Sequence, residues 1–360
     1  MFRLKSVTRS AFTVGLCAFF APCLFSGAIA TSSQDLSNTD VSAPLKANET
    51  TPAVSVSGNS TPTPSSIATG TTAGAVQNVC KYKYVTVNGV KIFYREAGPQ
   101  NAPVVLLLHG FPSSSRMYDG LMRKLSDRFH LIAPDYPGFG HSDAPSPSHY
   151  KYTFDNIAET MDAFTNAIGL KTYAMFFQDY GAPVGMRMAL KNPNRISALI
   201  IHNGNLYEEG LGPIWAARRA FWADRSANET ALKANFLSLE ATRKRHIGND
   251  PNVELYDPDL WSDEFAFLSR PGQVEIQTEL FFDYQTNLER YPLWQKWLRQ
   301  NKPETLVLWG RYDASFTEDG LRRLKNDVPE AEIHVLDAGH FAMDTKLDEI
   351  AELTRRFLRL

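Results

Sequence analysis

Residues 80–360 predict an α/β fold in which helices flank a mostly parallel sheet and a helical cap is inserted into the chain. Two observations lead to this prediction. Short apolar runs alternate with amphipathic patterns of helical period, which is typical of parallel strands joined by helices. One long aromatic-rich stretch, about 205–301, then interrupts the alternation before it resumes. The stretch from 80 to 360 is long enough to bury one sizeable core with such an insertion.

The first predicted element is a hairpin at one edge of the sheet. Two runs of strand-forming residues flank Asn88-Gly89, a pair that favours a tight hairpin turn. The apolar run at 104–108 shows no alternation, which indicates a central strand buried on both faces. Further strands are predicted at 130–133, 173–177, 196–201, 305–309 and 332–336, and helices at 116–128, 154–168, 182–191, 318–326 and 344–357.

The interrupting stretch has the composition of a buried helical layer. A structureless loop of this length is implausible inside a compact domain. Open α/β sheets bind ligands at the carboxyl ends of their strands, so we expect the stretch to form a cap over that edge. Its aromatic side chains favour a small apolar or aromatic substrate. They include Trp215, Phe221, Trp222, Phe236, Tyr256, Trp261, Phe265, Phe267, Phe281, Phe282 and Tyr284.

The N-terminal segment has the pattern of an export signal. Basic residues precede an apolar run, and small residues at 27–30 provide a cleavage site. We therefore expect residues 1–30 to be a signal peptide and the protein to be secreted or periplasmic, with a retained signal anchor as the alternative. Residues 31–79 are rich in Ser, Thr and Pro and lack apolar residues for a core, so a disordered linker is expected.

Composition narrows the covalent chemistry and the partners. Cys80 is the only cysteine beyond the signal, so no intramolecular disulfide is expected. Asn48, Asn59 and Asn228 lie in glycosylation sequons, which matter only in a eukaryotic host. The formal net charge of −2 favours neither nucleic acid nor, after signal cleavage, a membrane surface. No metal-ligand spacing and no glycine-rich phosphate loop occurs, so neither metal nor cofactor is predicted, and the oligomeric state is left open.

Three polar residues each follow a predicted strand. Asp179 follows the strand at 173–177, Asp313 the strand at 305–309, and His340 the strand at 332–336. Because the carboxyl ends of parallel strands meet at one edge of a sheet, we expect the three side chains to lie together beneath the cap. Asp179 stands in a strand-to-helix turn, where a hydrolase carries its nucleophile, and the order nucleophile, acid, histidine matches such a triad.

The carboxylate of Asp179 decides the class of reaction. A serine in this turn suits acyl transfer, whereas a carboxylate attacks an sp3 carbon with a strained or good leaving group. The chemistry is then epoxide opening or halide displacement. We expect the backbone N–H groups of Phe111 and Tyr180 to face the carboxylate, to keep it ionised and to stabilise the oxyanion of a later hydrolysis. Ser113 and Ser114 are weaker candidates for the nucleophile, because neither lies on the turn.

From about Tyr84 onward the chain resembles the α/β-hydrolase superfamily, in the branch of epoxide hydrolases and haloalkane dehalogenases. His-Gly-Phe-Pro at 109–112 is similar to the motif of epoxide hydrolases and fluoroacetate dehalogenases. Gln-Asp-Tyr-Gly at 178–181 resembles the haloalkane dehalogenase turn, which usually carries Trp after Asp. The loop at 134–142, Pro-Asp-Tyr-Pro-Gly-Phe-Gly-His-Ser, is also similar to that branch. The resemblance implies a hydrolase that uses Asp179, Asp313 and His340.

The motifs depart from the dehalogenase pattern at the halide donors. Tyr180 stands where that family usually has a tryptophan that binds the leaving halide. Phe111 stands where many members have an asparagine with the same role. Trp215 or Trp222 of the cap would have to replace these donors.

Epoxide opening needs a different group in the cap. The leaving alkoxide requires an acid, which the resemblance to epoxide hydrolases assigns to one or two cap tyrosines. Tyr284 is our first candidate and Tyr207 our second. The expected cap also contains Tyr256 and Tyr291.

The hypothesis from sequence is therefore a hydrolase that opens an epoxide, or a similar electrophilic alkyl carbon. Asp179 forms an alkyl-enzyme ester, and water activated by His340, which Asp313 orients, hydrolyses that ester. The alternative is a haloalkane dehalogenase with the same triad. A further alternative is a non-catalytic binding protein on the same fold, which an intact triad disfavours.

Overall fold

The computed structural model describes residues 79–358. The signal peptide predicted at 1–30, the linker at 31–79 except its last residue, and the sequons at Asn48 and Asn59 lie outside the described residues. Export therefore stays a prediction. Between residues 79 and 358, no helix is both long enough and apolar enough to cross a bilayer.

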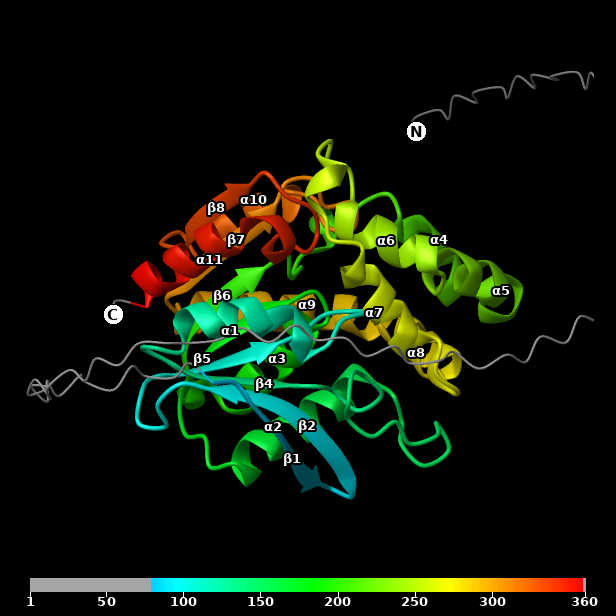
Figure 1. Ribbon diagram of the computed structural model, residues 1–360. Helices are drawn as coiled ribbons and strands as arrows, with labels where there is room; N and C mark the ends of the chain where they lie inside the picture. Colours follow the sequence, from blue (N-terminus) through cyan, green and yellow to red (C-terminus); the bar gives the residue numbers. More distant parts are fainter. Residues whose placement is uncertain (1–78, 359–360) are drawn as a thin grey trace, which may run out of the picture. The chain divides into compact units, whose positions relative to one another are not determined.

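The described chain is built around one eight-stranded sheet with the strand order β1-β2-β4-β3-β5-β6-β7-β8 (Figure 1). β2 runs antiparallel to both β1 and β4, and every other pair is parallel. The Asn88-Gly89 hairpin turn forms as predicted, with φ of 50° and 80°. The strands are β1 (Lys81–Val87), β2 (Val90–Ala97), β3 (Val104–Leu108), β4 (His130–Pro134), β5 (Tyr173–Gln178), β6 (Ile196–His202), β7 (Thr305–Gly310) and β8 (Glu332–Leu336).

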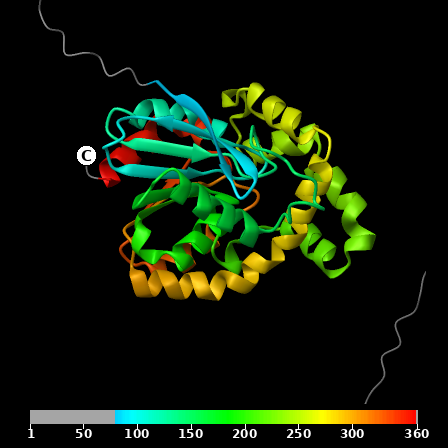
Figure 2. The ribbon, with the colours of Figure 1, turned by 90° about the horizontal axis from the view of Figure 1, so that it is seen from below.

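Helices cover both faces of this sheet (Figure 2). On β3, Val105 and Leu107 pack into one apolar core with α1 and α11. Leu106 and Leu108 pack into the other core with α2 and α3. The run at 104–108 is therefore the doubly buried central strand that its composition predicts. The helices outside the insertion are α1 (Asp119–Leu125), α2 (Phe154–Ala167), α3 (Gly181–Lys191), α10 (Asp319–Asp327) and α11 (Met343–Phe357).

The stretch between β6 and β7 is helical, and Figure 1 shows α4 to α8 gathered beyond the carboxyl ends of the strands. α9 extends from this group and also packs against α3 of the sheet layer. The predicted cap at 205–301 therefore includes a segment that supports the sheet. The helices are α4 (Trp215–Ala223), α5 (Arg225–Phe236), α6 (Leu239–Ile247), α7 (Asp259–Leu268), α8 (Gln273–Asp283) and α9 (Gln285–Asn301), with short 3-10 turns at Ser115–Tyr118, Pro193–Arg195, Glu208–Gly210 and Val253–Leu255.

Buried polar contacts fix the cap to the sheet layer. The ring nitrogens of His246 on α6 lie 2.9 Å from Glu264 of α7 and 2.8 Å from Asp344 of α11. The backbone N–H of Gly339 donates to the hydroxyl of Tyr256 at 3.0 Å. The cap is thus held against the same loop that carries His340.

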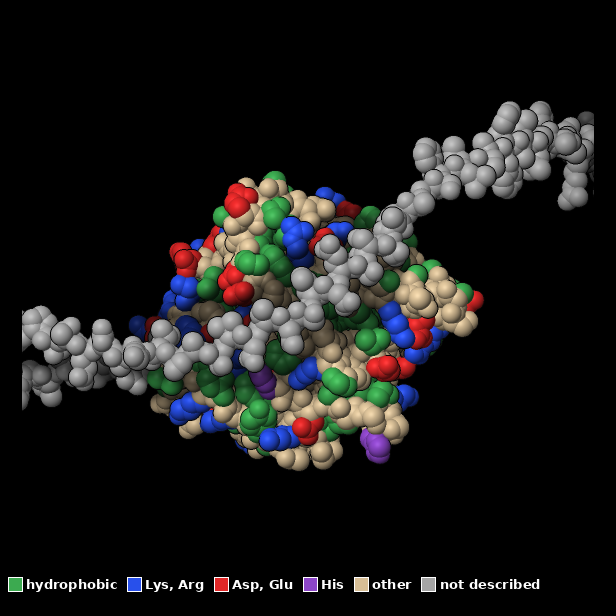
Figure 3. All heavy atoms as spheres, turned by 45° about the vertical axis from the view of Figure 1, so that its right-hand side comes forward, with side chains coloured by type: hydrophobic (Ala, Val, Ile, Leu, Met, Phe, Trp, Pro, Cys, Tyr) green, Lys and Arg blue, Asp and Glu red, His purple; other side chains and the backbone are tan. Residues whose placement is uncertain are grey.

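On the outer surface, basic and acidic side chains are interspersed over the face drawn in Figure 3.

Candidate active site

Asp179 stands on a sharp turn between β5 and α3. Its φ of 46° lies in the left-handed region that non-glycine residues rarely adopt, so the backbone here is strained. Two glycines allow the turn to pack closely. A Cβ at Gly110 would overlap the side chains of Gln178 and Asp179, and one at Gly181 would overlap the carbonyl oxygen of Leu108. The turn therefore holds the carboxylate outward from the end of a buried strand, which is what a nucleophile requires.

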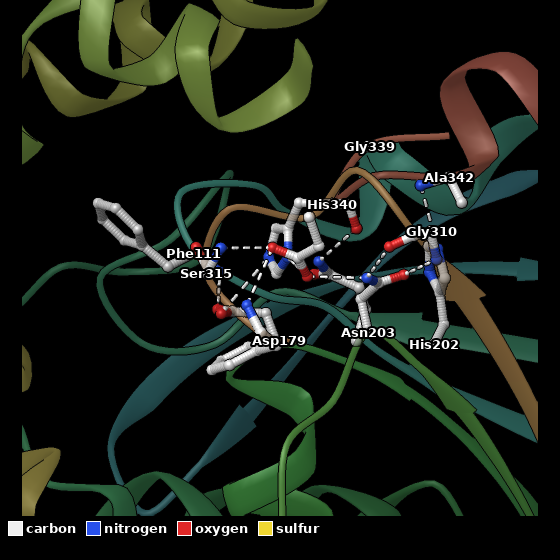
Figure 4. Close-up of polar contacts among 12 residues, drawn as sticks. Phe111, Asp179, His202, Asn203, Gly310, Ser315, Gly339, His340 and Ala342 are labelled. Atoms are coloured by element: carbon white, nitrogen blue, oxygen red, sulfur yellow. Dashed lines mark hydrogen bonds and ion pairs between the residues drawn. The ribbon is translucent and has the colours of Figure 1, made fainter. Parts of the chain in front are cut away.

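The structure brings the three predicted triad side chains together, and Figure 4 labels two of them, Asp179 and His340. His340 Nδ1 lies 2.7 Å from Asp313 Oδ2, and His340 Nε2 lies 3.5 Å from Asp179 Oδ2. The Phe111 N–H donates to Asp179 Oδ1 at 2.9 Å. Solvent reaches 9% of the Asp179 side chain but only 1% of His340 and of Asp313. The nucleophile candidate is thus the most exposed side chain of the triad.

The two predicted backbone donors behave differently. Phe111 binds the carboxylate, whereas among the described residues no hydrogen bond joins the Tyr180 N–H to Asp179. A second donor from Tyr180 therefore stays a prediction. His109, the first residue of the His-Gly-Phe-Pro motif, accepts the Tyr136 N–H at Nε2 over 3.2 Å and stacks on the Tyr136 ring.

Two residues that the sequence argument missed position the triad. Asn203 follows β6 with φ 42°, and its Nδ2 donates to Asp313 Oδ2 at 2.8 Å. Its Oδ1 accepts the Gly310 N–H at 2.9 Å, which fixes the amide orientation. His202 Nε2 accepts the N–H of Ala342 at 3.1 Å, and Ala342 follows His340 by two residues in the chain. The available signal was position alone, because both residues stand at the same sheet edge as the triad.

Asp313 is held by further donors. Its Oδ1 accepts the N–H groups of Ser315 at 2.6 Å and of Phe316 at 3.1 Å. Together with Asn203 and His340, these bonds give each oxygen of the buried carboxylate two partners. A carboxylate bound in this way has a fixed orientation and therefore fixes the imidazole ring.

The charges of the triad depend on one another. Burial by itself raises the pKa of Asp179, but His340, the Phe111 N–H and Arg218 outweigh it, and the pKa lies below its ordinary value. Burial lowers the pKa of His340, but the charge of Asp313 and the bond and charge of Asp179 outweigh it and raise the pKa to about 9. At neutral pH the resting site therefore holds an ionised Asp179 beside an imidazolium.

The cap residues proposed as halide donors are engaged elsewhere. The indole N–H of Trp215 donates to the Ser315 carbonyl at 2.8 Å, and that of Trp222 donates to the Phe281 carbonyl at 2.8 Å. Tyr207 also faces away from the site, because its hydroxyl donates to Asp327 of α10 at 2.8 Å. The second acid candidate from the sequence is therefore not at the triad.

Tyr284 and Tyr291 form a buried pair near Asp179. Their hydroxyls hydrogen-bond each other, and Asn205 Nδ2 donates to the Tyr291 hydroxyl at 3.3 Å. Two hydroxyls with one mutual bond leave one proton free to donate. Burial, more than any other cause, raises the pKa of both tyrosines, and the charge of Asp179 raises both further. Both hydroxyls therefore keep their protons at neutral pH, as acids for a leaving oxygen must.

The family of the chain follows from comparison with known proteins. Residues 103–347 match the family model of the alpha/beta hydrolase fold. The chain belongs to this family. It is a hydrolase of that fold, with a mostly parallel eight-stranded sheet and the helical insertion α4–α9.

Several relatives span most of this hydrolase. An uncharacterized hydrolase of Saccharomyces cerevisiae, YNR064C, is 39% identical over 275 residues, which cover 75% of this chain and 94% of the yeast protein. Haloalkane dehalogenase 2 of Mycobacterium bovis is 35% identical over 277 residues, which cover 72% of this chain and 89% of the mycobacterial protein. The crystal structure of Cfl2 from Burkholderia cenocepacia is similar in fold, with a TM-score of 0.66 at 21% identity, covering 78% and 96% of the two chains.

The raised pKa of His340 predicts a dependence on Asp179 that titration can measure. In Asp179→Asn the carboxylate charge is lost, so the His340 pKa should fall below its wild-type value of about 9. Histidine-resolved NMR titration of both proteins tests this, and an unchanged pKa would contradict the coupling.

The same pKa predicts how the stability of the fold depends on pH. Since folding raises the His340 pKa above 6.5, the contribution of His340 to the free energy of unfolding should be complete below about pH 6.5 and be lost as pH rises through 9.

Proposed function

We propose that this hydrolase opens an epoxide through an ester on Asp179. The observation that carries the proposal is the division of donors in the cap. The hydroxyls of Tyr284 and Tyr291 have a proton to give near Asp179, whereas the indoles of Trp215 and Trp222 are bound to carbonyls. An alkoxide leaving group needs a proton, and a halide needs only hydrogen-bond donors. The tyrosine pair therefore supplies the proton that only epoxide opening needs, while the two indoles predicted to bind a halide are occupied.

In the first step, Asp179 Oδ2 attacks a ring carbon of the epoxide. The bond from that carbon to oxygen breaks, and the oxygen takes a proton from the Tyr284–Tyr291 pair. Oδ1 becomes the carbonyl oxygen of the ester and stays bound to the Phe111 N–H. This N–H stabilises the negative charge that returns to Oδ1 when water attacks.

Ester formation prepares His340 for the second step. It removes the negative charge of Asp179, one of the influences that raise the His340 pKa, so the imidazole loses its proton more readily. Nε2 faces the ester, and Asp313 holds Nδ1 at 2.7 Å. The proton that the imidazolium gives up restores the tyrosine hydroxyl. The neutral ring then takes a proton from water, and the hydroxide attacks the ester carbonyl. The bond from that carbon to the substrate oxygen breaks, the oxygen takes the proton of the new carboxylic acid and leaves as the diol, and Asp179 is restored as a carboxylate beside an imidazolium.

Dehalogenation is the second candidate, and one observation favours it. The Tyr180 hydroxyl is buried without a hydrogen-bond partner, directly after Asp179 in the chain. A halide released from the attacked carbon could accept from this hydroxyl. The similarity to haloalkane dehalogenase 2 of Mycobacterium bovis also supports this reading. The same ester on Asp179 forms in both reactions.

Replacement of the histidine should trap the ester. His340→Gln keeps Asp179 able to attack but removes the base for hydrolysis, so incubation with styrene oxide should add the mass of the substrate to the peptide that contains Asp179. Peptide mass spectrometry reads this out, with Asp179→Asn as the unreactive control. If styrene oxide is turned over by the wild type while the His340→Gln peptide stays unmodified, the two-step scheme is wrong.

Removal of both acid hydroxyls should separate the two candidate reactions. In Tyr284→Phe/Tyr291→Phe, the single-turnover rate of epoxide opening should fall by about 10² to 10⁴, the usual contribution of a general acid. Release of bromide from 1-bromobutane needs no proton, so any such activity should fall far less.

Tyr207→Phe is the matched control for this experiment, because the Tyr207 hydroxyl is bound to Asp327 and faces away from the triad. It should open styrene oxide at close to the wild-type rate. Full epoxide activity in the double variant would remove the tyrosine pair from the mechanism.

A further inference from the structure

Two arginines of the cap each have a buried guanidinium nitrogen without an acceptor. Within residues 205–301, all of which the structure describes, every other arginine has a hydrogen bond or an ion pair. Arg218 on α4 is 3% exposed and its Nε has no partner. Arg245 on α6 is partly buried, and its Nη1 is buried with no partner. A buried N–H donor without an acceptor costs free energy, so two such arginines in one cap call for a functional explanation.

The neighbours in the chain make the contrast clear. Arg219 pairs with Glu208 at 2.9 Å, and Arg243 lies 3.5 Å from Glu240. The side chain of Arg219 is 45% exposed and that of Arg243 is 40% exposed. The helices that carry them therefore direct one arginine to solvent and a neighbouring one inward.

Arg245 lies over the ring of Phe111, the residue that holds the nucleophile, and Arg218 lies one aromatic ring further away. Cζ of Arg245 is 4.5 Å from the centre of the Phe111 ring, and the Phe111 N–H is bonded to Asp179. Cζ of Arg218 is 5.3 Å from the ring of Phe281, which in turn packs 4.9 Å from Phe111. The two guanidiniums therefore approach the Asp179 carboxylate from the cap side.

Tyr180 adds a third donor to this region. Its ring lies 5.6 Å from that of Phe111, and its buried hydroxyl has no hydrogen-bond partner. The charges of Arg218, Asp179 and Arg245 all act on the pKa of this hydroxyl, which burial, the largest influence, raises. The three unpartnered donors, one on the turn and one on each of the cap helices α4 and α6, therefore lie in one region.

No acceptor among the described residues satisfies these donors. The aromatic rings stabilise the guanidinium charges but accept no in-plane N–H. Asp179 is committed to the Phe111 N–H and to His340. Glu264 is the other carboxylate whose charge raises the pKa of Arg245, and it is bound to His246 at 2.9 Å.

We infer that Arg218, Arg245 and the Tyr180 hydroxyl form an anion subsite that binds a carboxylate carried by the substrate. The inference rests on the proposed function: the substrate class is an epoxide with a carboxylate next to its ring. The two oxygens of a carboxylate match two guanidinium donors, and a planar anion suits their flat geometry. The arginines also offset the repulsion between this carboxylate and Asp179, which would otherwise disfavour attack.

A charged substrate and its neutral amide test the subsite. Oxirane-2-carboxylate and oxirane-2-carboxamide differ by one charge at nearly equal size. Wild-type kcat/KM should favour the carboxylate by about 10- to 100-fold, the range for a hydrogen bond to a charged group. In Arg218→Met and Arg245→Met this preference should fall towards one. In the matched surface controls Arg219→Met and Arg243→Met it should stay at the wild-type value.

Thermal unfolding of the same variants excludes a purely structural role. Removing an unpaired buried charge should leave the Tm of Arg218→Met equal to or above that of the wild type. A lower Tm with an unchanged substrate preference would assign the arginine to folding and overturn the inference.

The remaining outcomes separate the inference from the proposed function. If both epoxides react equally and His340→Gln still traps an ester, the subsite is wrong and the proposed function stands. If neither epoxide reacts, calorimetry with the diol 2,3-dihydroxypropanoate and its amide decides. Binding of the acid alone, weakened in Arg218→Met, supports the subsite. No binding of the acid, or bromide binding as tightly as the acid, overturns it.

Discussion

The structure depends on one constraint, the display of an ionised carboxylate in a strained turn at the end of a buried strand. Asp179 adopts a strained φ of 46° at this position, and the glycines at 110 and 181 leave room for the turn. The Phe111 N–H and His340 then hold the charge that burial alone would disfavour. The proposed tyrosine acid and the proposed anion subsite both act on a substrate that this carboxylate attacks.

The two layers of the domain divide the chemistry. The sheet edge supplies the nucleophile, its backbone donor and the His340–Asp313 pair, which Asn203 and His202 hold in place. The cap carries the groups that we propose meet the substrate: the Tyr284–Tyr291 pair and the two arginines of the anion subsite. Such a division would allow changes in the cap to alter the substrate while the residues at the sheet edge stay the same.

The sequence predicted the parts that repeat along the chain. Apolar runs located six strands and the Asn88-Gly89 turn located the hairpin, while the positions of Asp179, Asp313 and His340 after strand ends predicted the triad. It could not predict orientation within the cap. Tyr207 and Tyr284 look alike in the sequence, yet one hydroxyl binds Asp327 and the other lies near Asp179. Arg218 and Arg219 are adjacent, and only the helix packing decides which is buried.

The most direct test of the ester is a single turnover of styrene oxide in H₂¹⁸O with enzyme in excess. If water attacks an ester on Asp179, the label should appear in the Asp179 carboxylate and the first diol should carry only unlabelled oxygen. Mass spectrometry of the diol and of the peptide that contains Asp179 measures both. Label in the first diol, with none on Asp179, would mean that water attacks the epoxide directly and would contradict the account.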